Sequence, residues 1–367
     1  MRPRPVGPAP RGEGPAACPG SPALAPRCGV GHAPARPRPG GVEDVVARWG
    51  QHGPARLAVG SRGAVVVTGG AGFIGSTLAD SLVADGREVH VVDDLSTGHQ
   101  HNVPPQARFH RVDIRDAAAV ADVVRQASPV AIFHLAAQAD VRKAIAGPAF
   151  DADVNIGGTL SVLEAARAVD ATVVFAATGG GSYGEYEGLA IPTPESAEPR
   201  PMSHYGQSKL AGEGYCALYG RLYGLATTRL RLGNVYGPRQ DPHGEAGVVA
   251  IFSGKLIDGE PMTVFGDGLQ TRDYVYVDDV VDAFMRAEGG PGDVTLNIGT
   301  GREVSVLDLV RILGGGEPVF APARTGELQR SCLDWARAAQ VLGWSPVTAV
   351  EDGLPRTHAA IAAGRGT

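Results

Sequence analysis

Short apolar runs alternate with amphipathic stretches along this chain from residue 64 onwards. The runs are rich in valine and isoleucine, whose branched side chains favour strands that are buried on both faces. The stretches between them repeat apolar residues at helical spacing. Strands are predicted at residues 64–67, 88–92, 108–112, 130–134 and 172–176, and helices at 76–83, 117–126 and 150–168. Since the two kinds of element alternate, we predict an α/β fold with a doubly wound parallel sheet and right-handed crossovers.

A glycine-rich turn joins the first predicted strand to the first predicted helix. Gly69 would permit a tight turn, Gly72 would let a diphosphate approach the backbone, and Gly75 would let the helix pack closely on the strand. Phe73 and Ile74 lie in the same motif at the start of the helix, whose free N–H groups can bind phosphate. Because the chain contains 52 glycines, the G-x-x-G-x-x-G spacing taken alone is equally compatible with an ordinary turn.

An acidic pair, Asp93 and Asp94, follows the second predicted strand. In dinucleotide-binding folds an acid about 20 residues past the glycines holds the ribose hydroxyls of NAD, and its charge repels the 2′-phosphate of NADP. We therefore predict NAD as the cofactor and Asp93 as the ribose ligand, with Asp94 as the less favoured candidate. A solvated acid in a turn is the alternative, which the glycine motif makes less favoured.

Further cofactor contacts are predicted at the next strand ends and in one helix. They are Asp113, Ile114, Leu135, Ala136, Ala137 and Asn155. Asp113 would lie beside the adenine and accept from its amino group, although a turn residue at the strand end is about as plausible. The small residues 135–137 indicate backbone that a ligand approaches, whereas Asn155 could bond either backbone or cofactor. His134 is predicted to be a packed residue at a strand end, without a chemical role.

Tyr205 and Lys209 lie four residues apart, which places them on one face of a helix. A lysine ammonium near a tyrosine hydroxyl stabilises the phenolate and lowers the tyrosine pKa from its usual value of about 10. The positive nicotinamide ring of NAD⁺ would lower this pKa further. We therefore predict that Tyr205 is a general base near neutral pH, assisted by Lys209. The Y-x-x-x-K pattern is weak by itself, but here it follows a dinucleotide-binding motif at the expected distance.

The first 62 residues differ in composition from the rest of the chain. They hold 12 of the 28 prolines and nine arginines against three acidic residues, in a chain whose net charge is −6. Such a segment buries too little apolar surface to order itself, so residues 1–63 are predicted to be a disordered tail, or upstream sequence translated from a misassigned start. The arginines are scattered and lack a lysine or aromatic cluster, which does not favour nucleic-acid binding.

The cysteines and the apolar runs indicate a cytoplasmic protein. Cys18, Cys28, Cys216 and Cys332 show no spacing typical of zinc ligands or of a disulfide framework, which fits a reducing compartment. The tail has no apolar segment of the kind found in secretory signals. No apolar run reaches the roughly 18 residues that a membrane-spanning helix needs, so no membrane association is expected.

The glycine motif and the Tyr205–Lys209 pair together identify the chain as a member of the extended short-chain dehydrogenases/reductases. Residues 231–240, 265–279 and 297–301 resemble the nucleotide-sugar branch of that family. From about residue 64 to residue 356 the chain is similar to UDP-glucose 4-epimerases, especially those with the run Asp241-Pro242-His243-Gly244-Glu245 after Arg239-Gln240. These motifs are long and specific, and only the tail lies outside the resemblance.

The resemblance implies roles for individual residues. Tyr205 would be the acid–base group and Lys209 would hold the nicotinamide ribose. Thr178 is the matching candidate for the hydroxyl that completes the catalytic triad, although better-known members carry this hydroxyl one residue later, where this chain has a glycine. The UDP contacts would be Asn234, Arg272, Arg324 and Glu327, and Ser331 would face the C2 substituent of the sugar. Without the resemblance, ordinary surface charge would be preferred for Arg324 and Glu327.

The implied activity is NAD-dependent inversion of C4 of a UDP-hexose through a 4-keto intermediate. The resemblance also implies a homodimer. The alternatives are another nucleotide-sugar epimerase or dehydratase, and a non-catalytic NAD-binding regulator. Dehydratases carry an Asp-Glu pair after the active threonine, whereas Gly179-Gly180 follow Thr178 here. Residues 64–235 would mainly form the NAD-binding domain, and residues 236–367 would mainly form a smaller nucleotide-sugar lobe, with some strands returning to the sheet. The helix at residues 306–320 would be shorter than is usual for the family.

Overall fold

A computed structural model of the chain describes residues 63–241, 247–290, 292–324 and 327–364. Residues 1–62 of the predicted tail and residues 242–245 of the 241–245 run therefore lie outside the described residues. Within them, no helix is both long and apolar enough to cross a lipid bilayer.

A seven-stranded sheet forms the centre of the described residues. Its strands are β1 (Val65–Thr68), β2 (Val89–Asp93), β3 (Arg108–Arg111), β4 (Ala131–His134), β5 (Thr172–Thr178), β6 (Thr227–Leu232) and β11 (Val294–Ile298). They are ordered β11-β6-β5-β4-β1-β2-β3, and all neighbouring strands are parallel. The order reverses between β1 and β4, so a ligand is expected at the carboxyl ends of these two strands. The predicted doubly wound parallel sheet of the Rossmann type is confirmed.

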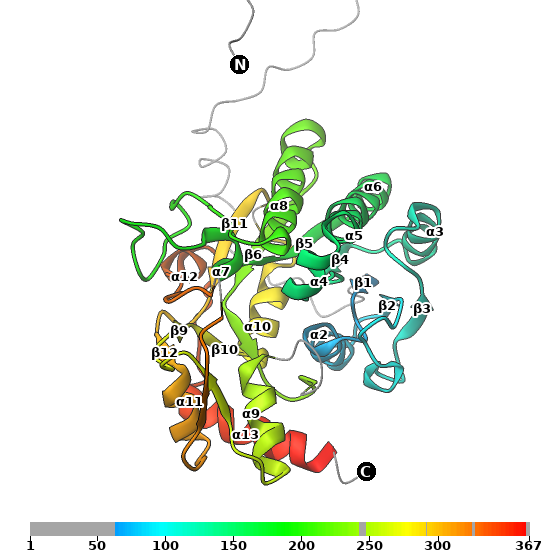
Figure 1. Cartoon of the computed structure of the whole chain (residues 1–367). Coiled ribbons are helices and arrows are strands. Elements are labelled where there is room, and N and C mark those ends of the chain that lie inside the picture. The colour runs from blue at the N-terminus through cyan, green and yellow to red at the C-terminus, as the bar shows by residue number, and fades with distance from the viewer. Residues whose placement is uncertain (1–62, 242–246, 291, 325–326, 365–367) are drawn as a thin grey trace, which may run out of the picture. The chain divides into compact units, whose positions relative to one another are not determined.

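Helices cover both faces of this sheet (Figure 1). One face carries α3 (Ala117–Ala127), α6 (Gly158–Val169) and α8 (His204–Tyr223), and the other carries α2 (Phe73–Ala84), α10 (Val277–Ala287) and α12 (Ala336–Leu342). Successive residues of a strand point to opposite faces. In β4, Ile132 accordingly packs in the first layer, while Phe133 packs in the second, 6.5 Å from Phe284 between ring centroids. Both layers bury the branched side chains that the sequence pattern marked.

A smaller lobe lies at one end of the sheet and holds α9, α11 and α13 (Figure 1). Its helices are α9 (Val248–Ile257), α11 (Val306–Ile312) and α13 (Val350–Gly364). Its strands form three two-stranded sheets from β7 (Asn234–Tyr236), β8 (Thr263–Phe265), β9 (Thr271–Arg272), β10 (Tyr274–Tyr276), β12 (Val304–Ser305) and β13 (Val319–Ala321). A separate apolar cluster that includes Phe252, Tyr276 and Leu354 fills the lobe. The short predicted helix near residue 306 is α11, which has seven residues.

The helix predicted at residues 150–168 is interrupted. The structure has α4 (Val141–Ala146), α5 (Pro148–Ala152), a π-helical turn at Asp153–Gly157 and then α6. Two glycines, Gly157 and Gly158, weaken the helix there. In addition, the Thr159 hydroxyl donates a hydrogen bond to the Asn155 carbonyl at 2.7 Å. Such π turns are often found at functional sites. The continuous helix was therefore a wrong prediction, because the sequence pattern does not reveal where one extra residue enters a turn.

Strand β5 is longer than predicted and ends at Thr178. Its last two residues, Ala177 and Thr178, pair with Arg231 and Leu232 of β6. The short helix α7 (Gly179–Tyr183) follows directly, and a 3-10 turn at Gln100–Asn102 precedes β3. The extension brings Thr178 to the carboxyl end of the sheet, beside the end of β6 and beyond the last pair with β4.

Candidate active site

The glycine turn after β1 is tight and open on one side. Gly69 has a φ of +71°, a left-handed conformation that glycine adopts without strain. A Cβ on Gly75 would stand 2.1 Å from the Gly69 carbonyl oxygen, so the start of α2 lies directly on the turn. A Cβ on Gly72 would meet only that same oxygen, at 3.3 Å. Phe73 and Ile74, like Gly72, are partly exposed. The backbone at Gly72 is thus accessible to a phosphate group at the positive end of a 12-residue helix.

Asp93, at the end of β2, braces this turn. Its Oδ2 accepts from the Ala71 N–H at 3.0 Å and its Oδ1 from the Leu95 N–H at 2.9 Å. Burial raises the pKa of Asp93, while the two backbone hydrogen bonds act in the opposite direction. A carboxylate has further acceptor sites, so it can hold ribose hydroxyls as well. Asp94 is exposed, and its Oδ1 accepts a hydrogen bond from Ser96 N within its own turn at 2.9 Å.

Asp113 and Ile114 follow β3 and have different surroundings. Arg115 donates to Oδ2 of Asp113 at 2.6 Å, and this hydrogen bond lowers the pKa of the Asp113 carboxyl. The same guanidinium also reaches Asp153 at 3.3 Å. Ile114 is buried, and a Cβ on Gly158 would stand 2.4 Å from its side chain. An adenine contact through Asp113 would therefore share a carboxylate that already has a cationic partner.

The segment after β4 lies against the glycine turn. Its residues Leu135, Ala136 and Ala137 are partly buried. A Cβ on Gly69 would stand 2.6 Å from the Ala136 nitrogen, so this small residue and the turn approach each other closely. Asn155 fixes the far end of the segment, because its amide accepts from Gln138 N at 3.0 Å and donates to Gln138 O at 2.9 Å. The Asn155 side chain therefore bonds protein backbone, which is the first of its two predicted partners.

A chain of hydrogen bonds through His134 connects the same elements. The Thr159 hydroxyl donates to the Asn155 carbonyl, so Nε2 of His134 must be the donor to Thr159 Oγ1 at 3.1 Å. Nδ1 then accepts from the Thr68 hydroxyl at 2.7 Å. Burial lowers the pKa of His134 to about 3, and the charge of Lys209 adds to this effect. A neutral histidine with both nitrogens bonded suits the packed role that was predicted.

Helix α8 presents Tyr205 and Lys209 to the end of the sheet. Ser203 caps the helix by accepting from Gly206 N at 3.0 Å. Lys209 is 3% exposed, and its ammonium lies 4.2 Å from the centre of the Phe175 ring in β5. Burial lowers the pKa of Lys209 to about 8. The two residues share a helix face, as their spacing requires.

The pKa of Tyr205 differs from the prediction. The phenol is partly buried, and burial together with the negative charge of Asp151 raises its pKa to about 12. Lys209 lies over Phe175 and is not among the groups that shift Tyr205. The expected lowering is therefore not a property of the protein's own groups. A cation next to the phenol, such as the nicotinamide ring, would have to supply it.

The turn after Thr178 joins the two halves of the candidate site. The Thr178 hydroxyl accepts from Gly181 N at 3.4 Å, which leaves its own proton available to a ligand. A Cβ on Gly206 would stand 2.3 Å from the Gly181 carbonyl oxygen, so the residue after Tyr205 lies directly against this turn. On the other side, a Cβ on Gly180 would stand 2.7 Å from Ser331 Oγ. Gly206 thus lets the start of α8, which carries Tyr205, lie against this turn, and Gly180 lets Ser331 approach it.

A cavity of about 180 Å³ in the lobe holds two of the predicted UDP contacts, Arg324 and Glu327. The guanidinium of Arg324 lies 3.9 Å from the centre of the Phe265 ring. Arg272 approaches Glu327 at 3.6 Å and donates to the Thr271 carbonyl at 2.8 Å. Asn234 is exposed and lies on β7, where it pairs with Tyr274 of β10. An aromatic ring, two guanidinium groups and a carboxylate suit a base, a diphosphate and ribose hydroxyls.

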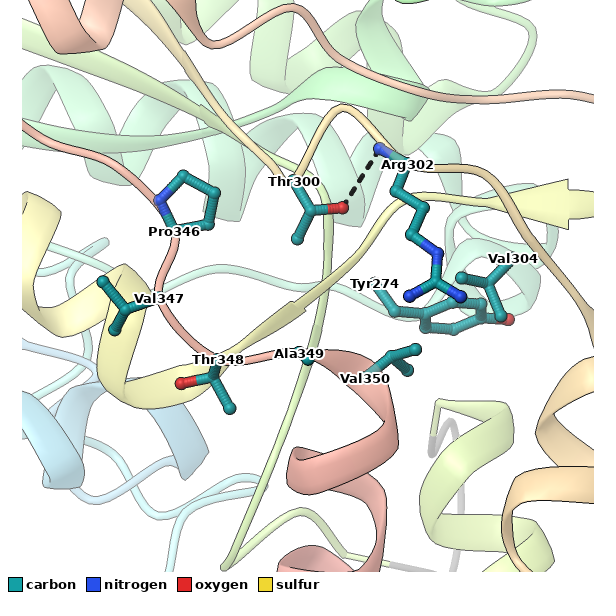
Figure 2. A pocket seen from close by; sticks show the side chains of 9 residues that line it. All are labelled: Tyr274, Thr300, Arg302, Val304, Pro346, Val347, Thr348, Ala349 and Val350. Carbon is teal, nitrogen blue, oxygen red and sulfur yellow. Dashed lines mark hydrogen bonds between the residues drawn. The ribbon is translucent and has the colours of Figure 1, made fainter.

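Figure 2 shows a second cavity, of about 290 Å³, at the start of α13. Arg302 donates from its backbone to Thr300 Oγ1 at 3.2 Å, and its guanidinium pairs with Glu351 at 2.6 Å. Tyr274, Val304 and residues 346–350 complete the lining. Within the described residues, none of the predicted cofactor or substrate contacts lines this cavity. It is therefore separate from the candidate active site.

Sequence reasoning missed a buried network behind Tyr205 and Lys209. Glu213 accepts two hydrogen bonds from Arg231 of β6, at 2.6 and 2.9 Å, and both side chains are almost fully buried. Arg231 also donates to the Tyr183 hydroxyl at 2.7 Å, which donates to Asn297 at 2.9 Å. The signal was available, because Glu213 continues the four-residue spacing of the pair on α8, and an arginine inside an apolar strand needs an anionic partner.

A second missed residue is Asp273, which anchors the loops of the lobe. Its carboxylate accepts from the backbone N–H of Thr300 at 2.7 Å, of Gly301 at 3.2 Å and of Leu333 at 3.0 Å. Burial raises the pKa of Asp273, although these hydrogen bonds lower it. Asp273 thereby holds the segment that carries Ser331 next to β9, where Arg272 lies. The sequence gives no local signal for this role, since the three donors are far away along the chain.

Comparison with known proteins agrees with this geometry. Residues 65–299 match the NAD dependent epimerase/dehydratase family. The chain belongs to this family. Its cofactor is therefore NAD, and the glycine turn with Asp93 is the part of the structure that fits it. The match confirms the family that the glycine motif and the Tyr205–Lys209 pair indicated.

Three members of the family are similar over most of the described residues. A UDP-glucose 4-epimerase of Mycolicibacterium smegmatis is 48% identical over 305 residues, which are 80% of this chain and 96% of that protein. The structure of a UDP-glucose 4-epimerase of Thermotoga maritima with UDP-glucose is 44% identical, with a TM-score of 0.80 over 82% of this chain and 99% of that one. A Thermus thermophilus UDP-glucose 4-epimerase complex with NAD is 42% identical, with a TM-score of 0.76 over 81% and 98%.

Proposed function

We propose that this protein inverts C4 of UDP-glucose and UDP-galactose. The observation that carries the proposal is that Gly206, the residue after Tyr205, and Ser331 both lie against the turn after Thr178 at the end of β5. The NAD-dependent family and its UDP-glucose 4-epimerase members support the same reaction. The site residues named below are proposals that rest on this geometry.

Bound NAD⁺ supplies a hydride acceptor for the hydrogen on C4 of the sugar and later returns a hydride. Tyr205 takes the proton of the C4 hydroxyl as the C–H bond breaks, and gives it back to the oxygen of the 4-keto sugar afterwards. Lys209, on the same helix face as Tyr205, holds the nicotinamide ribose. The Thr178 hydroxyl donates to the sugar oxygen, which orients the C4 hydroxyl toward Tyr205.

The nucleotide is held apart from the reacting carbon. Arg272 and Arg324 bind the diphosphate as cationic forks, Glu327 accepts from the ribose, and Asn234 contacts the diphosphate from β7. Inversion at C4 requires the 4-keto sugar to present its opposite face to the returning hydride. A firm hold on UDP and a loose hold on the sugar satisfy this requirement. Gly180 supports the loose hold, because only the small side chain of Ser331 lies within 4 Å of where its Cβ would stand.

Two other activities are less favoured. A dehydratase needs an acid to protonate the leaving hydroxyl of the sugar, whereas the residues after Thr178 are glycines. A non-catalytic NAD-binding regulator would have no need for the acid–base pair of Tyr205 and Lys209, which is intact. The similarity to UDP-glucose 4-epimerases at 42–48% identity favours an epimerase over a dehydratase and over a regulator.

The decisive experiment is a coupled assay of the purified, NAD-bound protein against a panel of UDP-sugars. We expect interconversion of UDP-glucose and UDP-galactose, with absorbance of NADH appearing transiently in single turnover. Release of a 4-keto-6-deoxy sugar would identify a dehydratase instead. NAD binding without any turnover or NADH signal would favour the regulator.

We further propose the organisation of the active molecule. Residues 64–235 would mainly bind NAD and residues 236–367 would mainly bind the nucleotide sugar, because a separate apolar cluster fills the lobe, while α10, β11 and α12 return to the central sheet. A homodimer is proposed, supported by the exposed apolar side chains of Phe150, Leu222 and Tyr223. Light scattering on the NAD-bound protein measures its mass and so tests the homodimer.

The free, buried thiols of Cys216 and Cys332 support a reducing compartment such as the cytoplasm.

A further inference from the structure

Asp151 is a buried carboxyl group that the proposed mechanism does not use. It lies in α5 and is 0% exposed. Its Oδ1 accepts from Gln138 Nε2 at 3.0 Å and from Asn155 Nδ2 at 3.0 Å. Its Oδ2 is buried without a hydrogen-bond partner among the described residues. An unpaired oxygen on a buried carboxylate is costly, so a compensating positive charge is expected close by.

Lys209 is the cation that can compensate this charge. Helix α5 packs against α8, and Asp151 interacts electrostatically with both Tyr205 and Lys209. Lys209 is itself almost fully buried, over the Phe175 ring. A buried ammonium loses its proton easily unless an anion stabilises it. Two opposite charges that are both buried, on helices that pack together, therefore stabilise each other.

The other charged groups of this region have different partners or face solvent. On α8, Glu213 is paired with Arg231, and the thiol of Cys216 is neutral because burial raises its pKa to about 12. His134 of β4 is neutral because burial lowers its pKa to about 3. Of the remaining groups on the packed elements, His204 on α8, Arg142 and Lys143 on α4 and Asp153 after α5 are exposed, and Asp140 at the cap of α4 is half-buried. Asp151 is thus the buried anion that is left for Lys209.

We propose that Asp151 is the buried counter-charge of Lys209, and that its carboxylate fixes the pH range in which Tyr205 and Lys209 work together. This inference rests on the proposed function. Asp151 acts as a positioning residue, since it reaches the reacting atoms only through Lys209 and Tyr205. Its negative charge keeps Lys209 protonated and at the same time opposes formation of the Tyr205 phenolate. Both effects have the same sign, because each raises the pKa of its group.

The experiment is a pH profile of kcat/KM for the NAD-bound wild type and for Asp151→Asn. Removal of the charge lets Tyr205 ionise at lower pH and lets Lys209 lose its proton at lower pH. We therefore expect both limbs of the profile to move to lower pH, by about one pH unit. Asp151→Glu, which restores the charge, is expected to return both limbs toward the wild-type positions. A residue with only a structural role would lower the height of the profile without moving either limb.

The matched control is Asp153→Asn, which removes the same charge two residues away on the surface, where the side chain is 60% exposed. It is expected to leave both limbs in place. If Asp151→Asn folds poorly, Asp151→Ala removes the same charge without leaving an amide in the interior. Limbs that stay fixed in the neutral variants, or that move equally in the Asp153 control, would overturn the inference.

A second measurement separates this inference from the proposed function. The near-ultraviolet absorbance of phenolate is titrated in the NAD-bound protein, and the Tyr205→Phe titration is subtracted to isolate Tyr205. The Tyr205 signal is expected to appear about one pH unit lower in Asp151→Asn than in the wild type. An inactive wild type with this shift would count against the epimerase and in favour of Asp151. An active wild type without it would do the reverse.

Discussion

The cofactor side of the candidate site and its nucleotide side differ in the atoms that hold them together. On the cofactor side, backbone carries the site: Gly69 forms the turn, and Asp93 bonds the N–H groups of that turn. On the nucleotide side, side chains hold one another: Arg324 lies on an aromatic ring, and Arg272 faces Glu327 across 3.6 Å. The first is braced by hydrogen bonds within the protein, whereas Arg272 and Glu327, if they bind UDP as proposed, would have to exchange partners to do so. Changes on the two sides should therefore have different consequences.

The largest effect is expected where the two sides meet, at the catalytic pair. Tyr205→Phe removes the proton acceptor while the glycine turn that holds NAD is left intact. Since general acid–base catalysis contributes about 10²- to 10⁴-fold, kcat should fall by that factor with NAD still bound. The assay is epimerisation by the NAD-bound variant, with bound cofactor measured after denaturation. Retention of more than about a tenth of the wild-type rate would remove Tyr205 from the mechanism.

The second prediction tests how firmly the cofactor side is supported. Glu213→Gln leaves Arg231 buried without its anionic partner, and breaking such a pair destabilises a protein by about 3–5 kcal/mol. The control is Glu351→Gln, because its partner Arg302 is 57% exposed and surface pairs contribute only about 0–1 kcal/mol. Denaturation of both variants at equal NAD concentration measures the difference. Equal losses would mean that the buried network does not support α8.

The nucleotide side should respond in substrate choice more than in stability. Ser331 is small and lies against Gly180, so space beside the sugar C2 is expected, and we predict that acetamido sugars are accepted. Ser331→Tyr fills this space and should lower kcat/KM for UDP-N-acetylgalactosamine relative to UDP-galactose by about 10- to 200-fold. Ser331→Ala is the control, which keeps the space. If the wild type already discriminates by more than about 10³ and the tyrosine leaves that ratio unchanged, Ser331 is not the gate.

Acid pH should affect the cofactor side through His134. Its folded pKa of about 3 lies below the value of about 6.5 for an unfolded histidine. Between these values the unfolded chain binds a proton that the folded protein does not, so stability is lost as the pH falls. The wild type should lose about 1.4 kcal/mol more per pH unit in this window than His134→Gln. Parallel stability curves for the two proteins would show that His134 titrates normally.

The smallest effect is expected from removal of residues 1–62. Their composition gives them too little apolar surface to contribute to either side of the site. Epimerase activity and Tm of the shortened protein should match those of the full chain within error. A truncated protein that fails to retain NAD would show that the cofactor side depends on this segment.

The sequence by itself determined the parts that depend on neighbours along the chain. Alternating apolar runs fix strands and helices, since burial and periodicity are local properties of each element. The glycine motif, Asp93 and the Tyr205–Lys209 spacing are likewise readable in short windows. They were enough to predict the doubly wound sheet, NAD and the family, all of which are confirmed. The further roles given to single site residues stay predictions.

Only the tertiary structure decided which groups satisfy one another. The amide of Asn155 turns to the Gln138 backbone, and Arg231 finds Glu213 across the sheet-to-helix interface. The interrupted helix and the raised pKa of Tyr205 were also unpredicted. Partners far apart along the chain meet only after folding, and the surrounding protein then sets how strongly their charges interact. For the same reason Asp151, which no local pattern distinguishes, becomes the anion beside Lys209.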